Sequence, residues 1–153
     1  MTPEQRLEKL GIVLPPCPVP VANYIPFRIT GNLLYASGQG PKQEDGTYKE
    51  GRLGLTMDIA QGYEEARLTG LHLLAVCKAA LGELSRIESV VKLLGMVNAE
   101  PDFGDHPKVI NGCSDLFVEV LGEAGRHARS AIGMGSLPNR MAVEVEAIFQ
   151  IRL

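Results

Sequence analysis

The chain has 153 residues, 45% of them hydrophobic and 22% charged, and its formal net charge at pH 7 is −3. These values are typical of one soluble globular domain, and they exclude a disordered, collagen-like or disulfide-rich scaffold. The sequence has no Trp, four Tyr and four Phe. Because neither a basic surface nor a base-stacking platform is indicated, we do not expect nucleic acid binding.

The sequence shows no targeting or metal-binding pattern. The N-terminus has no basic region followed by an apolar stretch, and no apolar run approaches the roughly 20 residues needed to span a bilayer. The three cysteines, at positions 17, 77 and 113, form no C-x-x-C pair. We therefore expect a cytoplasmic protein without membrane contact, metal or cofactor.

The first 20 residues differ in composition from the rest. Thr2, Pro3 and Gln5 are typical of a helix start, as N-cap, first helical residue and capping-box residue. Four prolines within residues 15–20 favour an extended, polyproline-like segment. We therefore expect an N-terminal arm over residues 1–20 and a single domain over residues 21–153.

The rest of the sequence predicts helices and strands in the order ββ-α-β-α-ββ. Apolar residues at helical spacing predict helices over 57–82 and from Pro107 to Gly122. Apolar runs bounded by turn residues predict strands over 24–29, 33–37, 87–97, 130–134 and 143–151. A turn at 138–140 should join the last two strands into a hairpin.

Two helices are too few to cover both faces of the predicted sheet. We therefore predict an α+β sandwich with both helices on one face. The other face should be wet or buried in an oligomer, and Met134, Val143 and Val145 offer apolar material for such an interface. Cys77 and Cys113 fall on the apolar stripes of the two helices, which is typical of small buried hydrophobic residues.

The three histidines, at positions 72, 106 and 127, do not indicate a metal site. They are far apart in the sequence, and only His106 is adjacent to an acidic residue, Asp105. We interpret all three as solvated or loop histidines.

Arg129 and Glu144 are the most informative pair. Counted outward from the turn at Asn139, they should lie close together on the two strands of the predicted hairpin. A guanidinium there could bind a carboxylate ligand, and a neighbouring carboxylate could activate water. From spacing alone, an internal salt bridge at the sheet edge is the alternative that these two residues favour. Gly38, in the Gly38-Gln39-Gly40 turn, is either a plain turn residue or a backbone donor to a ligand oxygen.

Several segments together resemble the RidA family, also called the YjgF or L-PSP endoribonuclease family. They are Tyr24, the strand and turn at 34–39, and the block that runs from Ala128-Arg129-Ser130 through Leu137-Pro138 to residues 143–148. The resemblance extends over about residues 21–152, and the last block is its most specific part. It implies a chorismate mutase-like fold with a mixed sheet, assembled as a homotrimer with clefts between subunits.

The resemblance also implies an activity, the hydrolysis of reactive enamines and imines such as 2-aminoacrylate to a 2-keto acid and ammonia. By position, Arg129 matches the family's carboxylate-binding arginine and Glu144 the glutamate that positions water. Tyr24 matches a cleft tyrosine and Gly38 a backbone donor. Asn111 is a weaker match to a polar residue on the second helix.

The sequence departs from the founding members at the N-terminal arm and in longer loops at 42–56 and 98–106. Ala131 stands where many members have Cys, which excludes a thiol mechanism at that place. Two alternatives to the deaminase remain. One is a non-catalytic protein that binds a small carboxylate in the same cleft. The other is the ribonuclease named in the older family title.

Overall fold

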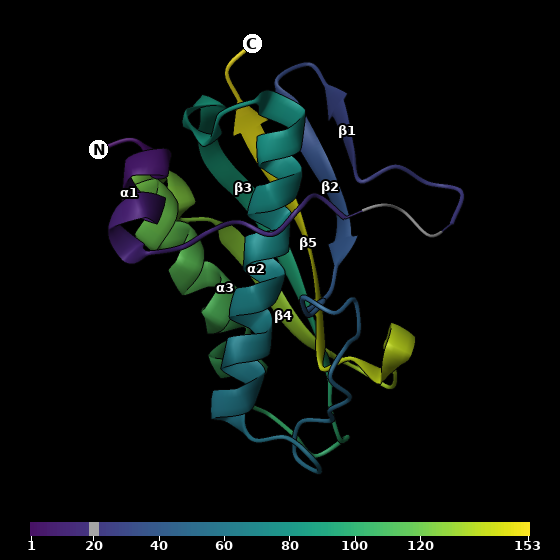
Figure 1. Cartoon of the computed structure of the whole chain (residues 1–153). Coiled ribbons are helices and arrows are strands. Elements are labelled where there is room, and N and C mark those ends of the chain that lie inside the picture. The colour runs from purple at the N-terminus through teal and green to yellow at the C-terminus, as the bar shows by residue number, and fades with distance from the viewer. Residues whose placement is uncertain (19–21) are drawn as a thin grey trace.

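A five-stranded mixed sheet lies at the centre of the computed structural model, which describes residues 1–18 and 22–153 (Figure 1). Its strands lie in the order β1-β2-β5-β3-β4. The strands are β1 (Phe27–Thr30), β2 (Leu33–Gln39), β3 (Ile87–Asn98), β4 (Ala128–Met134) and β5 (Val143–Ile151). The helices are α1 (Pro3–Leu10), α2 (Ile59–Leu81) and α3 (His106–Leu121), with short 3₁₀ turns η1 (Leu84–Arg86), η2 (Gly122–Gly125) and η3 (Pro138–Arg140).

The two long helices cover one face of the sheet, as predicted. Figure 1 shows α2 and α3 side by side in front of the strands, with α2 packed over β2 and β5 and α3 over β3 and β4. Asp58 caps the first turn of α2 in a capping box with Gln61. The helices approach closely at Gly112 of α3, where a Cβ atom would collide with the Tyr63 carbonyl of α2.

The core lies between these helices and the sheet. The predicted stripe of α3 is confirmed, because Ile110, Cys113, Phe117 and Val120 are all fully buried. Phe117 packs against Phe149 of β5 with ring centroids 5.9 Å apart. Loss of one such buried aromatic side chain typically costs about 3–5 kcal/mol of stability, so this contact is a major part of the core.

The predicted hairpin of the last two strands is wrong. β4 pairs in parallel with β3, and β5 lies between β2 and β3, antiparallel to both. The chain leaves β3, passes through α3 and η2 and returns to β3's outer side as β4, a crossover that makes parallel pairing. Residues 135–142, with η3, are longer than a hairpin turn and carry the chain past β3 to the centre of the sheet.

The predicted role of Val143 and Val145 at an oligomer interface is also wrong. Both are fully buried on the helix side of β5. Since side chains alternate along a strand, Glu144 and Glu146 then point to the sheet's other face, which we call the open face. The open face carries apolar side chains too, among them Tyr35 and Ile132, each 42% exposed.

The predicted N-terminal helix is confirmed as α1. Thr2 caps it, Gln5 completes the capping box and Gly11 ends it in the left-handed conformation. Leu7 is buried, and the Glu4 carboxylate accepts hydrogen bonds from the Leu84 amide and from Lys78. Residues 19 and 20 of the expected Pro-rich segment lie outside the described residues. Within the described part of the chain, we find no helix with the length and apolarity to cross a membrane.

Candidate functional site

Arg129 and Glu144 lie on opposite faces of the sheet. In β4, Arg129 is the register partner of Leu93, whereas Glu144 of β5 is the register partner of Met96. Register partners share a face, and positions three apart on one strand have opposite faces. The pair is thus separated by about 10 Å along the strands and about 10 Å across two strand spacings. The predicted closeness of these two residues within one chain is wrong.

Arg129 reaches toward α3 from the outer strand of the sheet. Its Nη1 donates one hydrogen bond to Asn111 Oδ1 at 2.8 Å and one to Ser114 Oγ at 3.1 Å. The side chain is half-buried. Among residues 1–18 and 22–153, no carboxylate pairs with Arg129, and its Nε and Nη2 groups have no hydrogen-bond partner. Neutral groups thus hold Arg129 from one side, and the Nε–Nη2 edge of its guanidinium stays free.

His127 completes this arrangement, and sequence reasoning missed it. Its Nδ1 donates to the Gly125 carbonyl at 2.6 Å, and its Nε2 lies 2.9 Å from Ser114 Oγ. The ring makes an edge contact with Phe117. Burial and the Arg129 charge hold the pKa of His127 below its usual value, although the Gly125 hydrogen bond raises it. We call Arg129, Asn111, Ser114 and His127 the arginine cluster.

A second set of residues, on the open face, surrounds Glu144. Burial raises the pKa of the Glu144 carboxyl above its ordinary value, and the like charge of Glu146 makes a smaller contribution in the same direction. A Cβ atom at Gly38 would collide with the Glu144 carboxylate in its present position, so glycine lets this flexible side chain lie directly over β2. Gly38 lies at an irregular step of the β2–β5 pairing, between Ala36 and Gln39. The predicted turn residue therefore touches the predicted carboxylate.

Tyr48 joins this second set from the loop that follows β2. Its ring lies over Gly40, where a Cβ atom would come within 3.1 Å of Tyr48 Cε1. Burial raises the pKa of the Tyr48 phenol, and nearby Tyr24 and Glu144 raise it further. Tyr24 itself lies just before β1 rather than in the predicted strand, and is 47% exposed. We call Glu144, Gly38, Tyr48 and Tyr24 the glutamate cluster.

Sequence reasoning missed Tyr48 because loop residues show no period. The signal available was a single aromatic residue in an otherwise polar and unusually long loop.

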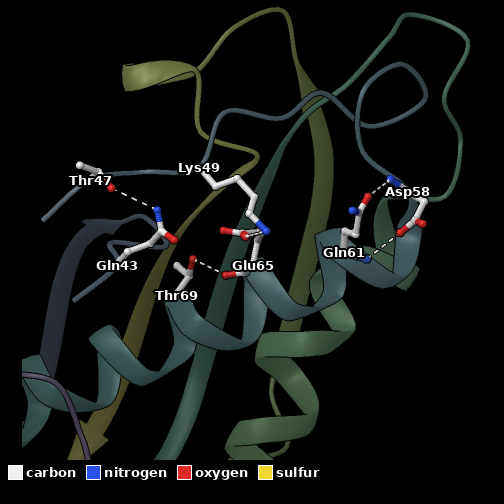
Figure 2. Close-up of polar contacts among 7 residues, drawn as sticks. All are labelled: Gln43, Thr47, Lys49, Asp58, Gln61, Glu65 and Thr69. Atoms are coloured by element: carbon white, nitrogen blue, oxygen red, sulfur yellow. Dashed lines mark hydrogen bonds and ion pairs between the residues drawn. The ribbon is translucent and has the colours of Figure 1, made fainter. Parts of the chain in front are cut away.

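The loop that carries Tyr48 is fastened to α2. Figure 2 shows Lys49 extending from the loop to Glu65 on the helix, with Nζ and Oε1 3.8 Å apart. His72 Nε2 donates to the Lys42 carbonyl at 2.8 Å near the other end of the loop. The prediction that His72 is solvated is therefore wrong, because this side chain is only 5% exposed. These contacts hold the loop that carries Tyr48 against α2.

Burial raises the pKa of the Glu65 carboxyl, and the Lys49 charge partly opposes that rise. Within the described residues, Glu65 Oε2 and His72 Nδ1 have no hydrogen-bond partner. This pair of helix side chains therefore carries a desolvation cost that the loop only partly offsets.

A groove of about 330 Å³ lies beside residues 50–56, at the end of the loop that leads into α2. Arg52 lines it and donates from Nη1 to Asn98 Oδ1 at 2.7 Å and to the Gly135 carbonyl at 2.9 Å. Its Nε lies 3.4 Å from Glu100 Oε1, and Arg140 lies 3.8 Å from Glu50. Both arginines of this groove therefore have acidic partners, unlike Arg129.

The described residues include no group of three or more His, Cys, Asp or Glu side chains placed to hold a metal ion. Cys77 and Cys113 are fully buried, as predicted, and burial raises the pKa of both thiols far above its usual value. The chemistry of the chain at these clusters rests on one guanidinium, one carboxylate and their neighbours. Asn111 and Arg129 meet in the arginine cluster, and Gly38 and Glu144 meet in the glutamate cluster, where Tyr24 lies near Tyr48.

Comparisons with known proteins agree with the arrangement of these elements. A family profile described as "YjgF/chorismate_mutase-like, putative endoribonuclease" matches residues 4–146. The chain is 42% identical over 147 residues to Protein TCP17 of Trypanosoma cruzi, an alignment that covers 95% of this chain and 92% of that one.

Solved structures give the same result. Protein Atu1372 of Agrobacterium tumefaciens, described as having unknown function, is 47% identical with a TM-score of 0.91, covering 98% of this chain and 92% of that one. RidA from the Antarctic bacterium Psychrobacter is 29% identical with a TM-score of 0.62, covering 88% and 94%. The chain therefore belongs to the YjgF/chorismate mutase-like family.

Proposed function

We propose that this protein hydrolyses small imines and enamines of the 2-aminoacrylate type to a 2-keto acid and ammonia, in a cleft formed between two copies of the chain. One observation carries the proposal: Arg129 is half-buried, is held by two neutral acceptors and has no acidic partner in the described chain. A half-buried guanidinium whose partners are all neutral still attracts an anion from outside. The free fork of Nε and Nη2 suits a carboxylate.

The need for a second copy follows from the positions of the two clusters. Arg129 cannot reach Glu144 of its own chain, since the two face opposite sides of the sheet. β4 is an edge strand, and the open face carries apolar side chains beside Glu144. A neighbouring copy that packs its open face near β4 would bring its glutamate cluster opposite Arg129. Closed rings form from such unlike contacts, which is consistent with a homotrimer.

The proposed reaction needs one binding group and one base. Arg129 binds the substrate carboxylate. The Glu144 carboxylate of the adjacent copy takes a proton from water as the water oxygen bonds to the imine carbon, and the C=N π electrons move to nitrogen. Glu144 then returns the proton to nitrogen, which gives a carbinolamine. The same carboxylate takes the hydroxyl proton and passes it to the amino group, and the C–N bond breaks as the C=O bond forms, releasing ammonia and the 2-keto acid. An enamine such as 2-aminoacrylate enters this sequence as its imine tautomer, in which a proton has moved from nitrogen to the methylene carbon. One positioned base contributes about 10²–10⁴-fold, which suffices because imines already react with water.

The test is a coupled assay in which 2-aminoacrylate is generated in situ and its decay is followed. We expect Arg129→Ala to lower kcat/KM by about 10²-fold, since a carboxylate loses charged hydrogen bonds worth about 1.5–3 kcal/mol. Arg126→Ala is the matched control, because Arg126 is exposed and, in the described part of the chain, its guanidinium pairs with Glu123 alone. Unchanged turnover in Arg129→Ala would refute the role of this arginine.

A non-catalytic carboxylate-binding protein is the second candidate. It is favoured by the fact that Arg129 is fully braced without any help from Glu144. Such a protein would show a rise in melting temperature with pyruvate that depends on Arg129, but no turnover. Ribonuclease activity has less support, because the chain has a net charge of −3 and RNA binding depends on cationic surfaces.

A further inference from the structure

We infer that Ser114 and His127 are positioning residues that fix the guanidinium of Arg129, so that only its Nε–Nη2 edge is offered to a ligand carboxylate. This inference rests on the proposed role of Arg129 as the substrate's carboxylate partner. It adds that the ligand is a single carboxylate bound side-on, in the plane of the guanidinium.

Nη1 of Arg129 has no hydrogen left for a ligand. This nitrogen carries two hydrogens, and both are used, one by Asn111 Oδ1 at 2.8 Å and one by Ser114 Oγ at 3.1 Å. Two acceptors on one nitrogen fix the plane of the guanidinium and its rotation. Three hydrogens remain, and the one on Nε is parallel to one of the two on Nη2, which is the bidentate geometry that a carboxylate prefers.

The neighbours of Ser114 fix the direction of its hydroxyl hydrogen. A hydroxyl has one hydrogen and two acceptor sites, so it can face Arg129 correctly only if its hydrogen points elsewhere. His127 Nε2, at 2.9 Å, takes that hydrogen when it is unprotonated. The Gly125 carbonyl only accepts, and at 2.6 Å it holds the ring proton on Nδ1. The bonds therefore run in one direction, from Arg129 to Ser114 to His127 to Gly125.

The surroundings of His127 favour its neutral form. Arg129 on β4 is the charged group that acts on it, and it disfavours a second positive charge. From α3 the ring meets the Ser114 hydroxyl and, in a T-shaped contact with centroids 6.0 Å apart, the Phe117 ring, and from η2 it meets the Gly125 carbonyl. Cys113, buried beside Arg129, has a raised thiol pKa and stays uncharged. The ring is thus held by packing as well as by hydrogen bonds.

The test compares three variants with one control. Ser114→Ala removes the acceptor, Ser114→Thr keeps a hydroxyl, and His127→Phe keeps the ring packing on Phe117 but loses both hydrogen bonds. The control is Ser130→Ala, because Ser130 lies on the other face of β4 and its hydroxyl contacts Lys92 at 3.2 Å. Melting temperatures identify any variant that fails to fold.

Three readouts are made on the full-length protein. They are the Kd for pyruvate by calorimetry, kcat and KM in the coupled assay, and the NMR signals of the Arg129 guanidinium hydrogens without ligand. For Ser114→Ala and His127→Phe we expect Kd and KM to rise about 10-fold while kcat changes less than about twofold. The Nη1 hydrogens should be resolved in the wild type and averaged by rotation in these two variants. Ser114→Thr should restore the wild-type values, and Ser130→Ala should keep them.

The outcomes separate this inference from the proposed function. Wild-type Kd, KM and NMR signals in both Ser114→Ala and His127→Phe would overturn the inference while leaving hydrolysis in place. If the wild-type protein shows no turnover, but the NMR signals of Ser114→Ala and His127→Phe still differ from it as expected, the hydrolysis is overturned and the positioning is supported. A uniform loss of melting temperature with unchanged guanidinium signals would assign Ser114 and His127 a structural role only, and would also overturn the inference.

Discussion

Two arginines of this chain are braced in nearly the same way and differ in what faces their free edge. Arg52 donates from Nη1 to Asn98 and to the Gly135 carbonyl, and Arg129 donates from Nη1 to Asn111 and Ser114. The Nε of Arg52 meets Glu100 at 3.4 Å, whereas in the described chain Arg129 has no carboxylate opposite it. The brace alone therefore does not indicate function. The missing counter-charge at Arg129 is the feature that points to a ligand.

The strongest way to break this contrast is to give Arg129 a counter-charge of its own. Asn111→Asp places a carboxylate at the 2.8 Å contact with Nη1. We expect kcat/KM to fall about 10²-fold, because an internal anion neutralises the charge that the substrate needs. The melting temperature should stay equal or rise. Steady-state kinetics and thermal unfolding measure both, and undiminished turnover would show that the charge of Arg129 is not what the substrate uses.

The second test removes Arg52, the arginine whose free edge faces a carboxylate. Arg52→Ala leaves the buried Asn98 and the Glu100 carboxylate without their partner, so we expect a loss of about 2 kcal/mol of stability. For a domain of this size that corresponds to a fall of about 4–8 °C in Tm. The KM for the imine should hold its wild-type value. A large rise in KM at unchanged Tm would contradict the assignment of Arg52 to structure.

The same contrast extends to the carboxylates, since Glu100 has a cationic partner and Glu144, within the described residues, has none. A base must be charged to take a proton, and the pKa of Glu144 is raised by burial and by Glu146. The rate should therefore fall with decreasing pH at a higher pH than an ordinary Glu would give. Glu146→Gln removes the like charge. In a profile of kcat/KM against pH, this variant should therefore lose activity at a lower pH than the wild type does. Glu88→Gln, an exposed site on β3, is the control.

The smallest expected effect concerns Glu65, a buried carboxylate with an incomplete set of partners. Its pKa is raised in the folded state, so its contribution to stability is largest at low pH and is lost as pH rises through the unfolded and then the folded pKa. Glu65→Gln should therefore raise Tm by about 2–4 °C at pH 7 and leave it unchanged near pH 3. Thermal unfolding at the two pH values measures this. A lower Tm at pH 7 would mean that the Lys49 ion pair outweighs the burial cost.

The local elements could be predicted from the sequence, because periodicity and capping are local. The α3 stripe at Ile110, Cys113, Phe117 and Val120 was correct, as was the Thr2 capping box of α1. Strand neighbours depend on contacts distant in sequence, and the placement of β5 between β2 and β3 was missed for that reason. The faces of Val143 and Val145 were misassigned with it.

The candidate site was predicted unevenly for the same reason. Arg129, Asn111, Gly38, Glu144 and Tyr24 were named, but as one group rather than as two clusters on opposite faces. Tyr48 and Ser114 were not named at all, and His127 was interpreted as a loop histidine. Each of these three depends on a partner far along the chain or across a turn, namely Glu144, Arg129 and the Gly125 carbonyl. Residue type and spacing do not encode such pairs.

If the site is shared between copies, the separation of the two clusters allows two defective chains to complement each other and makes activity depend on assembly. Every chain would then supply a guanidinium to one neighbour and a carboxylate to another, so a defect in either half would be complemented by a chain defective in the other. Co-assembly of Arg129→Ala and Glu144→Gln chains, each inactive alone, would regenerate about a quarter of the sites by random mixing around a ring. Dilution below the dissociation constant of the assembly would separate the copies and remove the activity of the intact protein, so that specific activity would depend on protein concentration.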